Sequence, residues 1–461
     1  MFLFANALVL TINKARDVLL DGAVLVDGDR IVDIGDSAIL RARHPSVEII
    51  DCTGQVVMPG MVNTHTHLFQ TLLKGLGDDM DLKQWFSCMT GPAAEHLTVP
   101  DIHAAAVHGC VESIRAGVTT LVDFQYVHVQ PGMTDAVVEA FTRTGMRGFV
   151  CRGFLNTGIE HGVPAGLIEE TTTVMEDTRA AARRHNHEGA RVQVGIAPCM
   201  IWTVDEAGFR QARELADELG LLITTHLAET EFELQCSNAT YGCTDTALLD
   251  RIGFLGPDVL AVHCVNCSSH DIALLRKRDT KVSHNPCSNL YLASGIAPIP
   301  EMIKAGLTVS LASDGPASSN NHSIFQAMKF AALIQKGLHR DATIITAEAV
   351  LEMATIGGAR AVGLEDQIGS LEVGKKADLI VIGIDGPALT PFHNAPSALV
   401  YSALGHEVVS VIIDGSFVMR DGVVLSVDEV ATRMTAQHAA EALVERAGIG
   451  SLRNRGWNNQ T

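Results

Sequence analysis

Histidine and acidic residues gather in four short segments that lie far apart in the chain, each at the end of an apolar, strand-like run. Alternate residues of a strand point to the same side, so His65 and His67 are expected to direct both imidazoles at one point. A third histidine, His226, and the carboxylate of Asp314 would complete a nitrogen and oxygen ligand set typical of a catalytic divalent metal. The four segments are Asn63–His67, Thr225–Glu229, Val262–Cys264 and Ala312–Gly315.

Such a site predicts hydrolysis. A divalent metal lowers the pKa of a bound water to about 7, which makes hydroxide available at neutral pH. Glu229, three residues after His226, is expected to carry a proton from that water to a substrate nitrogen. His263 is expected to hydrogen-bond the attacking water or the developing oxyanion, and Asp314 to act as both ligand and proton acceptor. A lone histidine at a strand end is more often structural, but this whole set at ordered strand ends favours catalysis.

Three further residues are candidates for substrate contact. The amide of Gln70, just past the first histidine pair, can donate to and accept from the edge of a heterocycle. Trp85 could form the wall of a pocket for an aromatic ring, although ordinary helix packing also accounts for an indole. Arg152 ends a strand-like run and could face the pocket or form a stabilising ion pair, and the role of His284 stays open.

Eight strand-like runs alternate with amphipathic segments through the middle of the chain, which predicts a (β/α)8 TIM-like barrel over residues 56–371. The chemistry of such a barrel lies at the carboxyl ends of its strands, and the four histidine and acidic segments fall after strands one, five, six and eight. The expected strands are Val56–Met58, Thr119–Asp123, Gly148–Cys151, Val192–Ile196, Leu221–Thr225, Val259–Val262, Thr280–Ser283 and Leu307–Leu311.

Both ends of the chain are rich in short β-type runs separated by Asp-Gly turns. This pattern predicts a small β-sandwich domain composed of residues 1–55 and 372–461, with two independent terminal hairpins as the alternative.

Composition excludes some partners. Lysine and arginine number 34 against 53 aspartate and glutamate, a net charge of −19, which disfavours nucleic acid and anionic membranes. The apolar N-terminus lacks a basic leader and a cleavage site, so we expect a cytoplasmic protein. The ten cysteines are scattered and are expected to be free thiols.

Taken in order, these motifs resemble the amidohydrolase superfamily, specifically the mononuclear aminohydrolase branch. That branch includes S-adenosylhomocysteine and methylthioadenosine deaminases, guanine and 8-oxoguanine deaminases, and the triazine hydrolases atrazine chlorohydrolase and melamine deaminase. The matching segments are Pro59–His67, His226–Glu229, His263–Val265, Ser283–Asn289, Gly295–Pro298, Ser313–Gly315 and Gly374–Leu379.

The resemblance implies that His65, His67, His226 and Asp314 are metal ligands, that Glu229 and His263 handle protons, and that the protein is a homodimer or larger homo-oligomer. Gln70 and Trp85 stand where related enzymes contact their substrates. Binuclear relatives carry a carboxylated lysine near the end of strand four, where this chain has Ala197–Cys199. One divalent ion is therefore expected, zinc first and ferrous iron second.

Two departures bear on the substrate. S-adenosylhomocysteine deaminases have a histidine where this chain has Cys199, and an arginine in a loop that here reads Gly158–Pro164 without one. We therefore expect a hydrolytic deaminase of an amino-substituted N-heterocycle (a purine or nucleoside derivative, pterin, pyrimidine or s-triazine) that releases ammonia. A triazine-type hydrolase that displaces chloride or an alkylamine is the main alternative, and a non-catalytic scaffold a remote one.

Overall fold

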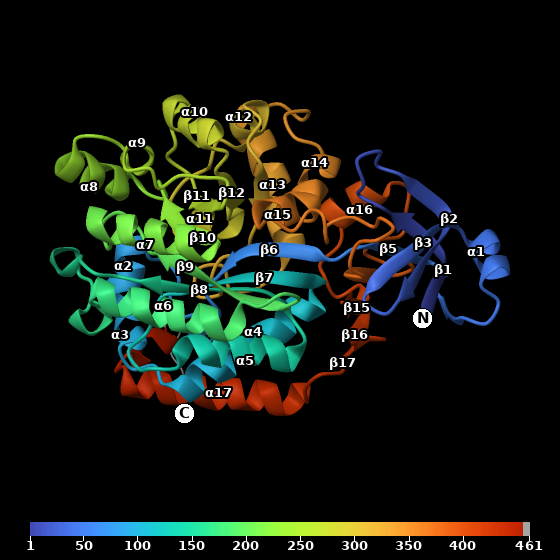
Figure 1. Ribbon diagram of the computed structural model, residues 1–461, viewed down its shortest axis with the longest axis horizontal. Coiled ribbons are helices and arrows are strands. Elements are labelled where there is room, and N and C mark those ends of the chain that lie inside the picture. Colours follow the sequence, from blue (N-terminus) through green and yellow to red (C-terminus); the bar gives the residue numbers. More distant parts are fainter. Residues whose placement is uncertain (455–461) are drawn as a thin grey trace.

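The structure, a computed structural model, describes residues 1–454. Eight parallel strands form the barrel that the sequence predicts, each hydrogen-bonded to the next along the chain (Figure 1). Asp314 N donates to His65 O at 3.1 Å, and Thr64 Oγ1 hydrogen-bonds Ser310 Oγ at 2.8 Å, so the last strand is tied back to the first. The strands are β6 (Met61–Thr66), β7 (Val118–Gln125), β8 (Arg147–Phe154), β9 (Val192–Pro198), β10 (Ile223–Leu227), β11 (Val259–His263), β12 (Lys281–His284) and β13 (Val309–Leu311).

Helices cover the outside of this barrel. Side chains set their ends: Thr98 and Asp101 form a reciprocal capping box at the start of one helix, and Ser268 and Asp271 form another. Within residues 1–454, no helix combines the length and the apolar character needed to cross a membrane. The helices are α4 (Val99–Arg115), α5 (Met133–Thr144), α6 (Thr171–His185), α7 (Glu206–Leu219), α8 (Glu231–Tyr241), α9 (Asp245–Arg251), α10 (Ser269–Arg278), α11 (Pro286–Tyr291), α12 (Ile299–Lys304), α13 (Ile324–His339), α14 (Ala347–Met353) and α15 (Ile356–Ala361).

Short helical turns between the strands lie near the carboxyl ends of the barrel. They are η1 (Leu68–Leu73), α2 (Leu82–Trp85), η2 (Phe86–Thr90), α3 (Gly91–Ala94), η3 (Ile159–His161) and η4 (Ala165–Leu167).

Strands from both ends of the chain form a second, mostly antiparallel sheet of nine strands. β5 pairs with both β1 and β14, so the two ends share one sheet and the alternative of two independent hairpins is wrong. An apolar core that includes Phe4 and Leu379 joins the two ends. The strands are β1 (Phe2–Leu10), β2 (Val18–Asp27), β3 (Arg30–Asp36), β4 (Glu48–Asp51), β5 (Gln55–Pro59), β14 (Leu379–Gly383), β15 (Val408–Ile413), β16 (Ser416–Arg420) and β17 (Val423–Val424), with α1 (Ser37–Arg43) and α16 (Ala395–Tyr401) beside them in sequence.

The first barrel strand was wrongly predicted. Val56–Met58 belongs to β5 in the terminal sheet, and the barrel begins with β6 after Gly60. The cause is the hydropathy of the two segments: β5 is apolar, whereas β6 contains Asn63, Thr64, His65 and Thr66, all buried. We propose Gly60 as the boundary between the terminal sheet and the barrel.

The C-terminal region does not lie wholly with the terminal sheet. Helix α17 (Glu429–Arg446) runs along the barrel against α4, followed by η5 (Gly450–Asn454) (Figure 1). Ion pairs from Arg115 to Glu429 and from Arg446 to Asp101 connect α17 to α4.

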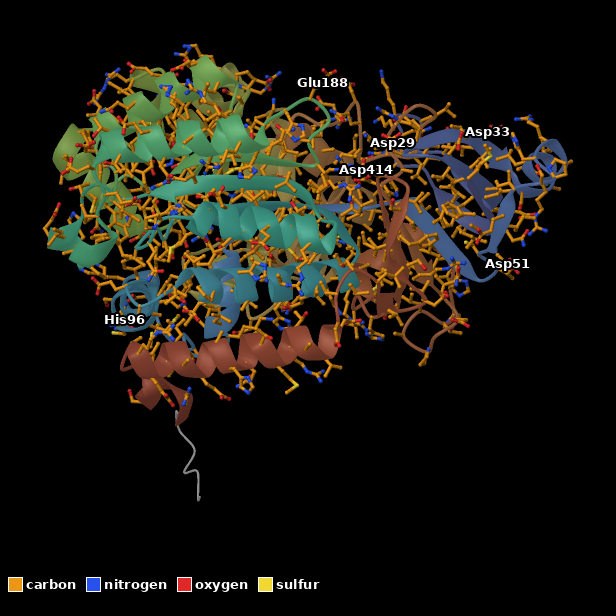
Figure 2. The ribbon with its side chains drawn as sticks, turned by 60° about the horizontal axis from the view of Figure 1, so that its bottom comes forward. Asp29, Asp33, Asp51, His96, Glu188 and Asp414 are labelled. Carbon is orange, nitrogen blue, oxygen red and sulfur yellow. The ribbon has the colours of Figure 1, made fainter. Side chains whose placement is uncertain are left out.

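Buried charges join the terminal sheet to the amino-terminal ends of the barrel strands. Arg147, the first residue of β8, bonds Asp378 through Nε at 2.7 Å and Nη2 at 3.1 Å, and also bonds Asp414. Arg191 Nε donates to Asp414 Oδ2 at 2.8 Å. Asp414 lies at this junction in Figure 2. We call Arg147, Arg191, Asp378 and Asp414 the junction cluster.

Candidate active site

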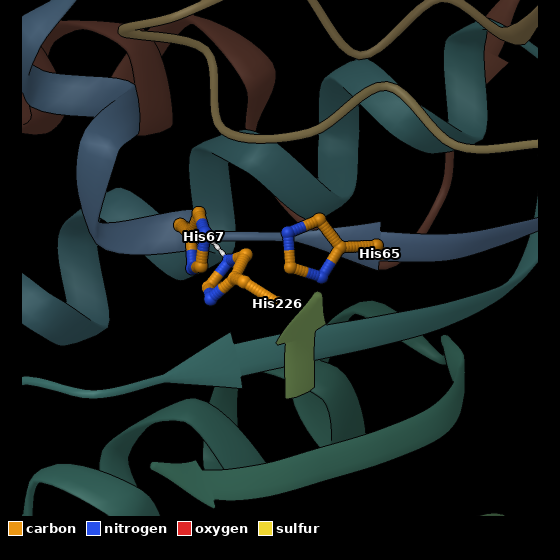
Figure 3. Close-up of side chains that lie close together, drawn as sticks. All are labelled: His65, His67 and His226. Carbon is orange, nitrogen blue, oxygen red and sulfur yellow. Dashed lines mark hydrogen bonds between the residues drawn. The ribbon is translucent and has the colours of Figure 1, made fainter. Parts of the chain in front are cut away.

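Three imidazoles meet at the carboxyl end of the barrel. His65 and His67 come from β6 and its end, and His226 comes from β10, with one ring nitrogen of each within 4.8 Å of the others (Figure 3). A second such group consists of His65, His263 and Asp314. Asp314 Oδ1 lies 3.2 Å from His65 Nε2 and 3.5 Å from His67 Nε2. The structure thus brings together the four side chains that the sequence predicts as ligands.

Hydrogen bonds to main-chain carbonyls fix which ring nitrogen carries the proton in His67 and in His226. His67 Nδ1 donates to Phe124 O at 2.7 Å, and His226 Nδ1 donates to Cys199 O at 2.9 Å. Each Nε2 therefore carries a lone pair, yet these two atoms lie only 3.3 Å apart, joined by the dashed line in Figure 3. Neither nitrogen of His65 has a hydrogen-bond partner among the described residues, although the side chain is fully buried.

These unpartnered nitrogens fit a cation. Burial lowers the pKa of His65 to about 4 and that of His67 to about 3, and it lowers the pKa of His226 well below its usual value. All three rings are then neutral at pH 7 and offer lone pairs to a metal. Three imidazole nitrogens and one carboxylate oxygen form a site for a divalent metal ion.

Asp314 is held in a fixed orientation. Its Oδ2 accepts from Ser318 Oγ at 3.1 Å and from Ser288 Oγ, and its main-chain carbonyl accepts from Thr66 Oγ1 at 3.0 Å. Burial alone would raise the pKa of Asp314, but the imidazole of His65, 3.2 Å away, outweighs it and holds the pKa well below its usual value. Asp314 therefore stays a carboxylate.

Backbone strain is concentrated at these strand ends. Four residues without the freedom of glycine have left-handed backbones there: Ala228 at φ 49°, His263 at 73°, Cys264 at 50° and Asp314 at 61°. Each such residue costs on the order of 1–3 kcal/mol, and clusters of them are typical of functional sites.

Glu229 and His263 lie side by side next to the ligand set. Glu229 Oε2 is 3.6 Å from His263 Nε2, and Glu229 Oε1 accepts from Ser294 Oγ at 3.2 Å. His263 Nδ1 donates to Asn289 Oδ1 at 2.8 Å, which leaves Nε2 as an acceptor in the neutral ring. Burial raises the pKa of Glu229, and the neighbouring His263 opposes that rise. A carboxyl with a raised pKa holds a proton more readily than an exposed glutamate, which suits a residue that takes up and releases one during the reaction.

A cavity opens above these residues. Its walls are largely aromatic and aliphatic, and no lysine or arginine occurs among the described residues that line it. The lining residues are His67, Gln70, Leu82, Trp85, Phe86, Tyr126, Leu155, Cys199, Met200, Trp202, Thr203, His226, Glu229, His263, Leu292, Asp314 and Ser318.

Gln70 and Trp85 both reach this cavity. The indole N–H of Trp85 donates to Ala317 O at 2.9 Å, which ties α2 to the loop after β13. Gln70 Oε1 has no partner among the described residues and is free to meet a ligand. A Cβ on Gly315 would lie 1.9 Å from that oxygen, so only glycine allows the amide to stand there.

Arg152 is a correction to the predicted set. It does not line the cavity; its guanidinium donates to Glu169 at 2.6 and 2.8 Å and to Asp177 at 3.2 Å. Position at a strand end does not show which face of the strand a side chain takes, and Arg152 lies on the helix side of β8. His284 is buried but also lies outside the lining, and burial lowers its pKa to about 3.

Sequence reasoning missed several lining residues. Tyr126 follows β7 and Trp202 follows β9, so their place just beyond barrel strands was the available signal. Three serines hydrogen-bond the carboxylates of Asp314 and Glu229: Ser288 in α11, and Ser318 and Ser294 outside the helices and strands. No local sequence pattern indicates these contacts.

The barrel and its three-histidine, one-aspartate centre define a metal-dependent hydrolase of the (β/α)8 type. A family model for the amidohydrolase family matches residues 56–418, so this chain belongs to the amidohydrolase family. The predicted class, a hydrolytic deaminase acting on a C–N bond of an amino-substituted N-heterocycle, is confirmed.

Relatives cover nearly the whole chain. A 5′-deoxyadenosine deaminase of Methanosarcina barkeri is 39% identical over 441 residues, 96% of this chain and 98% of the relative. A 5-methylthioadenosine/S-adenosylhomocysteine deaminase of Desulforudis audaxviator is 38% identical over 424 residues, 92% of this chain and 95% of the relative. The crystal structure of an adenosine deaminase from Xanthomonas campestris with bound zinc aligns with a TM-score of 0.89 at 30% identity, covering 96% of this chain and 98% of that one.

Proposed function

We propose that this protein deaminates the adenine ring of a nucleoside that carries a small uncharged group at its 5′ position. The observation that carries the proposal is the cavity: a proton-handling pair beside the ligand set, and an apolar wall without lysine or arginine. An apolar wall favours 5′-deoxy or 5′-methylthio groups, because the carboxylate of an amino-acid tail would be desolvated there without a cation to pair with. The relatives named for 5′-deoxyadenosine and 5-methylthioadenosine support the same class.

His65, His67, His226 and Asp314 would hold the metal, which we propose is a single zinc ion because imidazole-rich sets with one carboxylate suit zinc. Ferrous iron is the second choice. When bound, the ion supplies a Lewis acid and an acidified water. The zinc in the adenosine deaminase of Xanthomonas campestris supports this choice.

The residues beside the proposed ligands would transfer the proton, orient the attacking water and bind the substrate. Glu229 would accept a proton from the attacking water and deliver it to the ring nitrogen next to the reacting carbon, as its raised pKa allows. His263 Nε2, an acceptor in the neutral ring, would orient that water, because the bond from Nδ1 to Asn289 fixes the ring. Gln70 would hydrogen-bond the heterocycle edge, and Trp85 and Trp202 would enclose the nucleoside.

A triazine-type displacement of chloride or an alkylamine uses the same centre. Glu229 favours an amine, since ammonia is a poor leaving group that needs a proton donor and chloride does not. Analysis of the released product separates the two reactions.

The test is a panel of adenosine, 5′-deoxyadenosine, 5′-methylthioadenosine, S-adenosylhomocysteine, guanine, a pterin, cytosine and melamine, monitored by ultraviolet change and ammonia release. We expect the highest kcat/KM with the two uncharged 5′-modified nucleosides. A preference for S-adenosylhomocysteine, or for a triazine, would overturn the proposal. A homodimer or larger assembly and a cytoplasmic location stay predictions.

A further inference from the structure

The main chain that carries Glu229 is held by three side chains from three separate elements. Asp245 Oδ2 accepts from Ala228 N at 2.7 Å, and Glu233 Oε2 accepts from Glu229 N at 2.8 Å. Asn266 donates from its main-chain N to Ala228 O at 2.8 Å and from Nδ2 to Glu229 O at 2.9 Å. Every polar main-chain group of Ala228 and Glu229 is therefore bonded.

The Glu233 contact departs from ordinary helix capping. Glu233 is the third residue of α8 after the N-cap Thr230, and a glutamate there commonly reaches back to the N-cap N–H. Here it passes Thr230 and bonds the N–H of Glu229. The bond therefore holds the main chain of Glu229, which faces the cavity, and does not cap the N-terminus of α8.

Two features of this arrangement cost folding free energy: a strained backbone and buried carboxyl groups. Ala228 has the left-handed φ of 49°, so the direction in which Glu229 leaves β10 depends on a strained backbone. Glu233 and Asp245 are fully buried beside Glu229, and Glu233 Oε1 has no partner among the described residues. Burial, and then the charge of Glu229, raise the pKa of Glu233 well above its usual value, which favours the protonated form that does not repel Glu229.

We propose that Glu233, Asp245 and Asn266 are positioning residues that hold the carboxylate of Glu229 at the reacting ring nitrogen. The inference rests on the proposed function, in which Glu229 transfers the proton. None of these three residues lines the cavity or belongs to the ligand set, so we expect them to act through the main chain of Ala228 and Glu229.

The test compares Glu233→Leu with Glu233→Gln in the metal-loaded enzyme, with 5′-deoxyadenosine as substrate. Leucine fills the space but leaves the Glu229 N–H unbonded, and we expect kcat to fall on the order of 100-fold with KM unchanged, since a small misplacement of a reacting group has that effect. Glutamine keeps an oxygen that can accept from the Glu229 N–H, so its kcat should remain near that of the wild type.

Metal content and the pH profile distinguish positioning from a general loss of structure. We expect a full complement of metal in Glu233→Leu and a displaced acidic limb of its kcat profile, since Glu229 would then titrate in a changed position. Asn266 is only half-buried, so Asn266→Ala removes one of the bonds with less risk to folding and should lower kcat in the same sense.

Glu229→Gln, assayed in parallel, separates the two claims. Loss of turnover in Glu229→Gln together with wild-type kcat in Glu233→Leu and Asn266→Ala would overturn the positioning role alone. Wild-type turnover in Glu229→Gln would overturn the role of Glu229 and the positioning role with it. Equal losses in Glu233→Gln and Glu233→Leu would contradict the hydrogen bond as the cause.

Discussion

Both ends of the barrel bury polar side chains, but these side chains are hydrogen-bonded to one another at one end and left largely unbonded at the other. In the junction cluster, Arg147 and Asp378 are almost fully buried and bond each other with two hydrogen bonds, while Asp414 is shared between two arginines. At the opposite end, the rings of His65, His67 and His226 are equally buried, yet the nitrogens of His67 and His226 that bear lone pairs face each other, and the His65 ring forms no hydrogen bond among the described residues. Completed bonding at one end and unsatisfied nitrogens at the other distinguish a structural contact from a binding site.

The physical reason is the cost of burying polar atoms. A buried polar atom without a partner costs about 1–3 kcal/mol, so folding alone does not favour several such atoms at one point. Strained backbones at Ala228, His263 and Asp314 add to that cost at the same end. Together they indicate a site whose stability is completed by a ligand.

The largest expected effect that tests the difference between the two ends of the barrel is a loss of activity at the active-site end. Glu229→Gln should lower kcat by about 10²- to 10⁴-fold, because the side chain can no longer transfer a proton. Its metal content should stay at the wild-type level, since Glu229 is not one of the four proposed ligands. Steady-state kinetics with elemental analysis checks both values, and near-normal turnover would remove Glu229 from the reaction.

The junction cluster should respond in the opposite way. Arg147→Met leaves Asp378 and Asp414 without their main cation and should lower the free energy of unfolding by about 3–5 kcal/mol. The kcat of the folded enzyme should not change, because the cluster lies at the far end of the barrel. Urea unfolding measures the free energy of unfolding, and steady-state kinetics on the folded variant measures kcat.

A matched control for that variant is Arg179→Met, which breaks a partly exposed pair with Glu218. It should change the free energy of unfolding by at most about 1 kcal/mol. Equal destabilisation by the two variants, or a loss of kcat in Arg147→Met, would contradict the division between the two ends.

A smaller effect is expected from removing an unsatisfied ring. His65→Leu replaces a buried imidazole without hydrogen-bond partners by an apolar side chain of similar size. In metal-free protein the free energy of unfolding should change by at most about 1 kcal/mol, because relief of the unbonded ring nitrogens is offset by loss of the 3.2 Å contact with Asp314, while metal binding and turnover are lost. Thermal unfolding after chelation checks this, and a strong destabilisation would indicate a structural role for His65.

The smallest effect concerns pH. Burial alone would raise the pKa of Asp414, but Arg147 and Arg191 outweigh it and lower the pKa. A carboxyl with a lower pKa in the folded state stabilises the protein above its unfolded value near 4, and this contribution is lost as pH falls through the folded value. The wild type should therefore lose more stability than Asp414→Asn between pH 5 and pH 3, and equal losses would count against the ion pairs.

The sequence predicted those parts of the site whose identity depends on residue type and spacing. His65, His67, His226, Glu229 and Asp314 stand at the ends of β6, β10 and β13, where barrel geometry makes them converge. Hydropathy misplaced the first strand, because β6 buries polar residues in the barrel interior while β5 is apolar.

Long-range packing accounts for the other differences. The face taken by Arg152 depends on Glu169 and Asp177, which lie on segments that no local pattern links to it. The bonds from Glu233, Asp245 and Asn266 to the chain around Glu229 likewise exist only after folding.

The most direct measurement is the metal content of the purified wild type beside His226→Ala, with turnover of 5′-deoxyadenosine recorded on the same samples. Our account predicts about one divalent ion per chain in the wild type, loss of both ion and activity in the variant, and return of wild-type activity when zinc is added back after chelation. Full turnover by wild-type protein that contains no metal, or by His226→Ala, would contradict it.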